Sequence, residues 1–454
     1  MAKFKIHGVS GNGDTAIFIY DNITSELIRE DGLPIDLKPA TRREFPIGEA
    51  TIVSKDQPGK KTTPKVLKIQ LGLSCNYECT YCNQRFVPRT GEETNKDDID
   101  QFMDGLDAWV KEPPEKIEFW GGEPFVYIKT MKPLAERLRE KFPDTIFSVI
   151  TNGSLLNKET NRWLDKMGFR VGISHDGPGQ HVRGPDPFDD PVSREGIMDL
   201  RSRLKGSGRL SFNTMVHAEN MDRTAISDYF KKLLDDDEVM IGEGAFIDPY
   251  DEGALKESLS TREEHLFLRR TALQSIRDMS AMNMSVVPQR VREWWDSIAK
   301  GRHASTIGQK CGMDREDNIA VDLHGNVLTC QNVSPVATSF NGESHKIGHV
   351  SDFENIKLKT STHWSLREEC PNCPVLQGCK GSCMFLEGEY WKKSCDNAYS
   401  DHIPFFAAAI DALTWYLPYK IEHEALPEDR QNIFGNENEE AKPRKRFQIP
   451  VVAG

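Results

Sequence analysis

Ten cysteines are the residues of this chain whose spacing most clearly predicts chemistry. The first three, Cys75, Cys79 and Cys82, lie within eight residues and directly follow the apolar run at 66–71. Thiolates are soft ligands that suit iron–sulfur clusters. Because three thiolates leave one iron of a four-iron cluster without a protein ligand, this segment predicts a catalytic cluster with an iron open to a reactant.

The other seven cysteines lie between positions 311 and 395. Cys311 and Cys330 flank Gly325, with thirteen residues before the glycine and four after it. A compact CxxCxxxxxCxxxC pattern and one later cysteine complete the set, at Cys370, Cys373, Cys379, Cys383 and Cys395. In a reducing compartment such spacing predicts metal or cluster binding rather than disulfides.

Zinc is the alternative metal for both groups. A structural zinc site closes with four ligands, and no fourth Cys or His follows the first three cysteines at the spacing of a zinc ribbon. In the second group the compact pattern would close one tetrahedral site and give a zinc-stabilised binding module. That interpretation leaves the remaining thiols without a role, so iron–sulfur clusters are favoured.

The first group resembles the radical S-adenosylmethionine (SAM) superfamily, whose signature CxxxCxφC has an aromatic φ, here Tyr81. The resemblance implies that Cys75, Cys79 and Cys82 hold a [4Fe-4S] cluster whose open iron chelates the amino and carboxylate groups of SAM. In this family the reduced cluster cleaves SAM to methionine and a 5′-deoxyadenosyl radical, which the protein positions against a substrate hydrogen. The resemblance also implies a reductant such as flavodoxin or ferredoxin.

Three later segments end predicted strands and resemble the SAM-binding motifs of the same family. The first resembles GGEP, in which backbone groups and the acidic residue receive the SAM ammonium. The other two resemble the TNG and SxDGP segments; alone, each of the three would be an ordinary turn. Together they predict SAM contacts at Gly121, Gly122, Glu123, Pro124, Asn152, Ser174 and Asp176.

The second group of cysteines resembles the SPASM extension of radical SAM enzymes. This resemblance implies two auxiliary [4Fe-4S] clusters, of which the later is closed by Cys370, Cys373, Cys379 and Cys395. The nearer cluster then has only three thiolates, from Cys311, Cys330 and Cys383. Its fourth iron is either bound by Asp317, six positions after the first of these cysteines, or open to substrate or water.

Apolar runs that alternate with helical patterns predict the elements that position these cysteines. The strands are expected at 66–71, 116–120, 145–150, 169–174, 210–216 and 238–241. Helices are expected at 99–110, 157–167, 190–205 and 224–235, followed by 262–281 and 288–300. Alternation of this kind predicts a parallel sheet with crossover helices, and six units are fewer than the eight of a closed barrel.

The fold class is therefore α/β, with a partial (β/α)6 TIM-like barrel, a SPASM auxiliary-cluster domain and a C-terminal helix. Residues 1–64 are expected to form an N-terminal appendage and linker, and residues 65–300 the barrel. The auxiliary-cluster domain is expected at 301–400, with little regular structure over 308–397. Residues 401–454 are expected to form a helix at 403–417 and a polar tail.

Composition limits the function classes. The 454 residues include no apolar run long enough to cross a bilayer, and the start lacks the apolar core of a secretion signal. We therefore expect a cytoplasmic protein without a membrane partner. The net charge of -12 opposes a general nucleic-acid surface. The one clear basic run, at 442–446, is expected to be a solvated tail.

The resemblance implies a peptide or protein substrate, modified at an amino-acid residue by a maturase or an isomerase. Sulfatase-maturing relatives carry an acidic general base directly after the cysteine of Gx4C, where this chain has Gln331, and an amide cannot accept that proton. Formylglycine formation is therefore disfavoured, unless Asp317 or Asp322 substitutes. The short first 64 residues also lack the helical patterns of a leader-binding unit.

An alternative substrate is amino-acid-modified DNA. Phage pathways that hypermodify thymidine use a radical SAM isomerase on an amino-acid group, such as glycine, attached to the nucleobase. Here the resemblance concerns overall organisation without a diagnostic motif. The acidic net charge opposes it.

Overall fold

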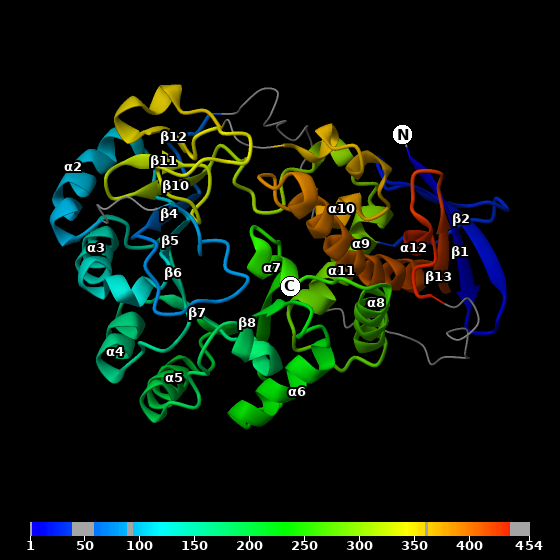
Figure 1. Cartoon of the computed structure of the whole chain (residues 1–454), viewed down its shortest axis with the longest axis horizontal. Coiled ribbons are helices and arrows are strands. Elements are labelled where there is room, and N and C mark those ends of the chain that lie inside the picture. Colours follow the sequence, from blue (N-terminus) through cyan, green and yellow to red (C-terminus); the bar gives the residue numbers. More distant parts are fainter. Residues whose placement is uncertain (1, 39–58, 89–93, 359–361, 436–454) are drawn as a thin grey trace.

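A computed structural model describes residues 2–38, 59–88, 94–358 and 362–435 of the chain. Figure 1 shows a large sheet with helices along one side and a smaller sheet at the opposite end of the molecule. The basic run predicted to be a solvated tail lies outside the described residues.

Six parallel strands form the barrel part of the large sheet. They are β4 (Val66–Gln70), β5 (Lys116–Trp120), β6 (Ile146–Thr151), β7 (Arg170–Ser174), β8 (Leu210–Val216) and β9 (Ile241–Phe246). They follow one another in chain order, as right-handed crossovers through helices produce. The predicted α/β fold with a parallel sheet is confirmed.

Crossover helices cover the outer face of these strands (Figure 1). Phe119, Phe147 and Phe169 pack there with ring centroids 5.4–5.6 Å apart, and none is more than 1% exposed. Alternate residues of the same strands face inward, and several of them are polar. The helices are α2 (Ile99–Trp109), α3 (Ile128–Lys141), α4 (Lys158–Lys166), α5 (Pro191–Leu204) and α6 (Arg223–Leu234).

The last barrel strand lies further along the chain than its predicted position at 238–241. It is Ile241–Phe246, with the sequence IGEGAF, and its register on β8 shifts between Thr214 and Val216. Two glycines weaken the intrinsic strand signal of this segment. Pairing with the neighbouring strand therefore sets its position.

The cysteine-rich region contains strands that its sequence did not predict. They are β10 (Asn318–Asp322), β11 (Asn326–Leu328) and β12 (Lys346–His349). β10 runs parallel to β4, with Ile319 opposite Leu67, so the region extends the large sheet to nine strands. Gly325 makes the turn between β10 and β11 with φ +81°. A Cβ at this position would lie 2.8 Å from His349 Nε2, so glycine is favoured here.

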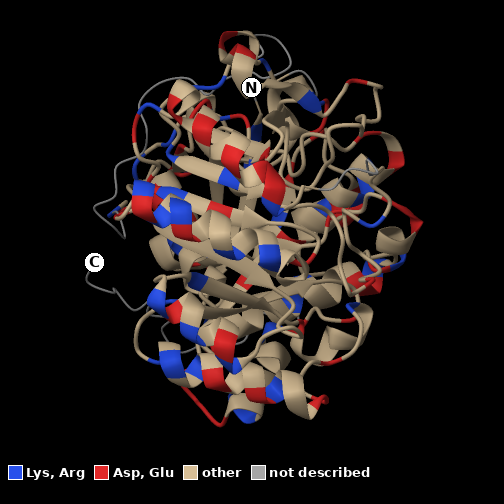
Figure 2. Ribbon diagram, turned by 90° about the vertical axis from the view of Figure 1, so that its left-hand side faces the viewer, with Lys and Arg blue, Asp and Glu red and all other residues tan. Residues whose placement is uncertain are grey.

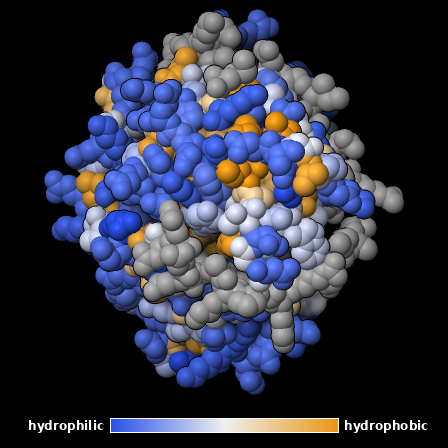
Figure 3. Space-filling view, turned by 90° about the vertical axis from the view of Figure 1, so that its right-hand side faces the viewer, coloured by the Kyte–Doolittle hydropathy of each residue, from blue (hydrophilic) through white to orange (hydrophobic). Residues whose placement is uncertain are grey.

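A second, antiparallel sheet joins the beginning and the end of the described chain. Its order is β13-β1-β2-β3, from Tyr416–Glu422, Lys3–Ser10, Thr15–Asp21 and Leu27–Arg29. Tyr20 of this sheet packs on Phe406 with ring centroids 5.0 Å apart. Figure 3 shows this side of the molecule, where small apolar areas lie among hydrophilic residues.

The central helix α11 (Gly388–Thr414) begins fifteen residues before the predicted start at 403. It therefore carries Cys395, and it packs between α8 (Arg262–Arg277) and α9 (Val286–Ala299). It ends where Trp415 adopts a left-handed φ of +70°, three residues before the predicted end. The remaining α-helices of the described residues are short: α7 (Glu252–Lys256), α10 (Leu376–Cys379) and α12 (Glu428–Gln431).

Surface charge is mixed in sign. Figure 2 shows acidic and basic residues interspersed over the side of the molecule that α2, α3 and α4 form. Among the helices that the structure describes, none combines the length and the apolar character needed to span a membrane.

Candidate active site

The first three cysteines lie on the loop after β4, at the carboxyl ends of the barrel strands. This loop packs directly on the 121–124 segment: the backbone N–H of Gly122 donates to Gly72 O (3.0 Å), and that of Glu123 donates to Ser74 O (2.9 Å). A Cβ on Gly122 would lie 2.4 Å from Ser74 O. Only glycine permits this backbone contact, which explains the paired glycines of the segment.

The three thiols lie close to one another. Burial, opposed by the Arg183 guanidinium and assisted by the neighbouring thiols of Cys82 and Cys75, raises the pKa of Cys79 to about 11. Backbone N–H groups of Tyr77 and Gln84 donate to the sulfurs of Cys75 and Cys82, both at 3.4 Å. Amides that donate to sulfur stabilise thiolates, as a bound cluster requires.

Glu123 joins two of the predicted SAM-binding segments. Its carboxylate accepts from the N–H of Phe125 (3.1 Å), the hydroxyl of Thr151 (2.8 Å) and the N–H of Asn152 (2.7 Å). The side chain is buried, and it caps the short helix that Pro124 begins. Glu123 therefore fixes the relative position of these segments, a role that its sequence motif does not reveal.

Asn152 connects the third strand end to the cysteine loop. Its Nδ2 donates to Asn76 Oδ1 at 2.9 Å, and Asn76 in turn donates to Ser154 Oγ at 2.8 Å. Asn76 directly follows Cys75 in the sequence. The structure thus places the loops at 75–82, 121–124 and 151–154 against one another.

Asp176 forms a buried network under the same loop. It accepts a hydrogen bond from the Tyr81 hydroxyl, which also accepts from Arg183 Nη1 at 2.8 Å. The N–H of Met215 donates to the other carboxylate oxygen at 2.9 Å. The predicted contact residue Ser174 ends β7, two positions before Asp176.

Two residues of this site were not predicted from the sequence. Arg183 lies 3.7 Å from Asp176 and near all three thiols. His217 is fully buried, 3.7 Å from Asp176, and neither ring nitrogen has a hydrogen-bond partner in the described chain. Burial lowers the pKa of His217, so the ring is neutral. Both residues come from loops without a recognisable spacing, so no local signal identifies them.

The thiols of four cysteines of the second group interact electrostatically, and one of them, Cys395, lies on α11. Burial raises the pKa of the Cys370 thiol, and the thiols of Cys379, Cys395 and Cys373 raise it further. Asn22 Nδ2 donates to the carbonyl of Cys373 at 2.9 Å, so the N-terminal sheet also holds this group in place. These four are the residues predicted to close the later auxiliary cluster.

The remaining three cysteines form a separate group beside the barrel. Burial raises the pKa of Cys330 to about 11 and that of Cys383 to about 12, and the Cys311 thiol raises both. Among the described residues, no three His, Cys, Asp or Glu side chains gather as ligands of a single metal ion. The assignment of these three thiols and the other four to two auxiliary clusters stays a prediction.

The carboxylates considered as a fourth ligand or as a base are engaged elsewhere. Asp317 pairs with Arg315 at 2.7 and 2.8 Å, and its carbonyl accepts from the first residue of β4, at the amino end of that strand. Asp322 accepts from the N–H and side chain of Asn326 at 2.9 and 2.8 Å. The ligand role of Asp317 is thus not supported, because its carboxylate is held by Arg315.

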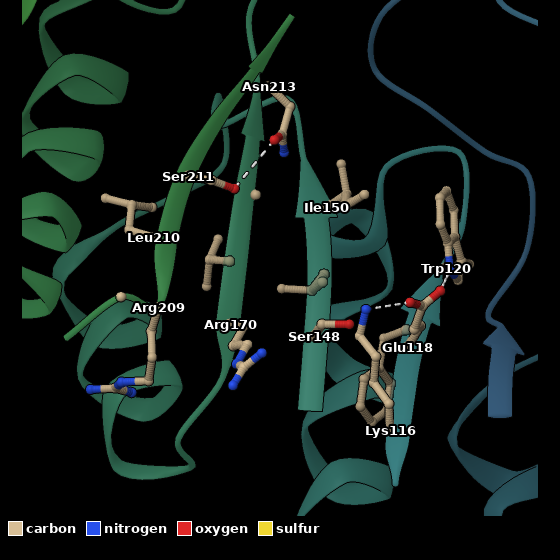
Figure 4. Close-up of a pocket in the computed structure, with 15 residues that line it drawn as sticks. Lys116, Glu118, Trp120, Ser148, Ile150, Arg170, Arg209, Leu210, Ser211 and Asn213 are labelled. Atoms are coloured by element: carbon tan, nitrogen blue, oxygen red, sulfur yellow. Dashed lines mark hydrogen bonds and ion pairs between the residues drawn. The ribbon is translucent and has the colours of Figure 1, made fainter. Parts of the chain in front are cut away.

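The inner face of the barrel strands lines a half-open pocket of about 230 Å³ with mixed polar and apolar walls, called the lumen here (Figure 4). Glu118, on the strand at one side of the pocket, lies 2.5 Å from Lys116 and 3.4 Å from Lys68, and accepts from Trp120 Nε1 at 3.0 Å. Burial would raise the pKa of Glu118, but Lys68 and Lys116 lower it. The pocket is lined by Lys116, Glu118, Trp120, Ser148, Arg170 and Asn213, among others.

Lys68 connects the lumen to the three-thiol group. Its Nζ donates to Oε1 of Gln331 at 3.4 Å, and Gln331 directly follows Cys330 in the sequence. Gln70, two residues along β4, donates to the carbonyls of Gln331 and Val333 at 2.7 Å. The residue that directly follows Cys330 is therefore an amide paired with an ammonium group.

Comparisons with known proteins agree with this geometry. Residues 69–224 match the model of the Radical SAM superfamily. The chain is 24% identical over 353 residues to the serine-type anaerobic sulfatase-maturating enzyme of Klebsiella aerogenes. The matched region covers 70% of this chain and 79% of that enzyme. It is 26% identical over 179 residues to the radical SAM cyclopropyl synthase TigE of Paramaledivibacter caminithermalis, and spans only 38% of that relative.

The fold is also that of a solved structure. Native anSMEcpe with bound AdoMet superposes with a TM-score of 0.54 at 18% identity, over 76% of this chain and 99% of that chain. This chain therefore contains a domain of the radical SAM superfamily over residues 69–224, and its cysteine-rich C-terminal region fits the SPASM extension.

Proposed function

We propose that this radical SAM enzyme abstracts hydrogen from an amino-acid residue of a peptide or protein. The carrying observation is that the loops at 75–82, 121–124 and 151–154 meet at the carboxyl ends of the strands that form the lumen. Chemistry at the strand ends of such a barrel can act on a group held inside it. The expected cofactors, a [4Fe-4S] cluster with SAM, are those that this superfamily uses.

In this proposal Cys75, Cys79 and Cys82 hold the cluster, which supplies the electron that cleaves SAM. Glu123 keeps the backbone groups of two loops in place for the SAM amino group. The buried guanidinium of Arg183 is the charged group beside the thiols that suits a carboxylate. Asp176 fixes this guanidinium through Tyr81.

The lumen is proposed to receive the residue that is modified. From Lys116 to Trp120 it extends over four strand positions, about 13 Å at ~3.3 Å per residue. A side chain or a short extended peptide fits this depth, whereas duplex DNA would have to extrude a nucleotide. Solved anSMEcpe structures contain AdoMet and a peptide, which supports a peptide substrate for a chain of this fold.

The reaction is proposed to differ from formylglycine formation. Gln331 replaces the acidic residue, and its side chain contacts Lys68. Asp317 and Asp322 are held in local contacts and cannot substitute without rearrangement. A different bond is therefore expected to form or break in the product.

The test is anaerobic turnover with deuterated candidate peptides, followed by mass analysis of 5′-deoxyadenosine. Deuterium in 5′-deoxyadenosine identifies both the substrate and the carbon from which hydrogen is taken. A parallel reaction contains DNA with a deuterated amino-acid group on thymidine. Transfer from DNA alone would replace the peptide proposal with the DNA alternative.

A further inference from the structure

Tyr250 contacts a predicted cluster ligand from the barrel side. It follows β9, and its hydroxyl donates to Cys383 Sγ at 2.8 Å. The thiol of Cys330, from the same three-thiol group, also interacts electrostatically with Tyr250. The contact thus reaches across from the loop after the last barrel strand to the cysteine-rich region.

A second contact from the same loop fixes the geometry of this hydrogen bond. Asp248 Oδ1 accepts from the hydroxyls of Ser382 (2.7 Å) and Ser394 (2.5 Å). Ser382 directly precedes Cys383, so the loop holds two consecutive residues of the cysteine segment. These contacts stabilise a segment with an unfavourable backbone conformation, because Lys380, Gly381 and Ser382 all have φ between +51° and +77°.

The short distance between the Tyr250 oxygen and Cys383 Sγ decides whether Tyr250 is a hydrogen-bond donor to the sulfur or a ligand of iron. Each iron of a four-iron cluster takes its own outer ligand, whereas the Tyr250 oxygen lies within hydrogen-bond distance of a sulfur that is itself predicted to be a ligand. An oxygen in that place acts through the sulfur. It is therefore a donor to Cys383 rather than the missing fourth ligand.

We propose that Tyr250 is a positioning residue for the nearer auxiliary cluster, and that its O–H···S bond raises the reduction potential of that cluster. The inference rests on the proposed ligand role of Cys311, Cys330 and Cys383. A donor to the sulfur stabilises the additional negative charge of the reduced cluster more than that of the oxidised cluster. Loss of the donor therefore lowers the potential.

The test compares Tyr250→Phe with wild type after anaerobic reconstitution of the full chain. Cys75, Cys79 and Cys82 are changed to Ala in both proteins, so that only auxiliary clusters are measured. Iron content and a potentiometric titration followed by electron paramagnetic resonance are recorded. We expect unchanged iron content, a lower midpoint potential for one cluster and no change for the other.

Tyr390→Phe is the matched control. Tyr390 packs on Phe340 with ring centroids 5.7 Å apart, and its hydroxyl has no hydrogen-bond partner among the described residues. Equal shifts in both variants, or none in Tyr250→Phe, would overturn the proposal. Loss of about one cluster of iron in Tyr250→Phe would also overturn it and make Tyr250 a ligand.

The reference protein tests the underlying assignment separately. If it binds no auxiliary iron, the ligand role of the three thiols fails, and the role of Tyr250 fails with it. If it binds both clusters and only the potential is insensitive to Tyr250, the ligand assignment stands and the positioning role is wrong. Retention of the cluster with a lower potential supports both.

Discussion

At the scale of single residues, the three loops around the first thiol group are joined by specific side chains. Glu123 connects two of them, and Asn76 connects the cysteine loop to the third. The glycines of the 121–124 segment permit close backbone contact. Cofactor chemistry at this site is therefore expected to depend on both ligands and connectors.

Replacement of Cys75, Cys79 and Cys82 by Ala should abolish SAM cleavage, because no thiolate then holds the catalytic cluster. The auxiliary iron should remain, since the other seven cysteines form their own groups. Iron analysis and chromatography of 5′-deoxyadenosine measure the two effects. Continued 5′-deoxyadenosine formation by this variant would show that the catalytic assignment is wrong.

Glu123→Gln should weaken SAM binding by about tenfold or more. The amide keeps the size of the side chain but presents N–H to one of three donors, and a hydrogen bond to a charged group contributes about 1.5–3 kcal/mol. Equilibrium binding of SAM to the reconstituted protein measures the change. Glu118→Gln, on the strand that precedes the Glu123 loop, is the control, and equal losses in both variants would assign Glu123 no particular role.

At the scale of elements, local signals predicted most of the sheet. Strand and ligand patterns are local, so the sequence predicts β4 to β8 closely. The position of β9 and the existence of β10 depend on pairing with a neighbour, which no local pattern encodes. Arg183 and His217 were missed for the same reason, because only the fold brings their loops to the cysteines.

A buried ion network joins the barrel to the central helix. Arg223, which is 0% exposed, lies 2.8 Å from Glu243 of β9 and 2.5 Å from Asp401 of α11. Arg290 of α9 contacts the same two carboxylates at 3.4 and 2.7 Å. Two cations therefore balance two anions at the contact between these elements.

Arg223→Met should lower the free energy of unfolding by about 3–5 kcal/mol, because it leaves a buried carboxylate without its counter-charge. Denaturant unfolding followed by circular dichroism measures the change. Arg162→Met, at an exposed position of α4, should have little effect. A change below about 1 kcal/mol for Arg223→Met would mean that Arg290 alone balances both carboxylates.

At the scale of the whole molecule, stability should depend on pH through buried histidines. His345 is 6% exposed, bonds to the Thr329 hydroxyl at 2.6 Å and packs on Phe385. Burial lowers the pKa of His345 to about 4. As the pH falls, the unfolded chain, with a histidine pKa of about 6.5, therefore binds a proton at a higher pH than the folded chain does.

Because of this difference, the folded state should lose stability as the pH falls from about 6.5 to about 4, by up to about 3 kcal/mol from His345. His345→Gln keeps a polar partner for Thr329 but removes the titrating group. The fall in Tm between pH 7 and pH 5 should be smaller in this variant than in wild type. An equal fall in both would assign the acid sensitivity to other groups.

The pairing of β1 with β13 has a consequence for the order of biosynthesis. The ribosome makes residues 416–422 about 400 residues after residues 3–10, a delay of about 20–80 s at ~5–20 residues per second. Cys395, on the helix just before β13, also emerges late. Iron insertion into the four-thiol group must therefore wait until Cys395 has been synthesised, long after the strands β1 and β2 and the first three cysteines.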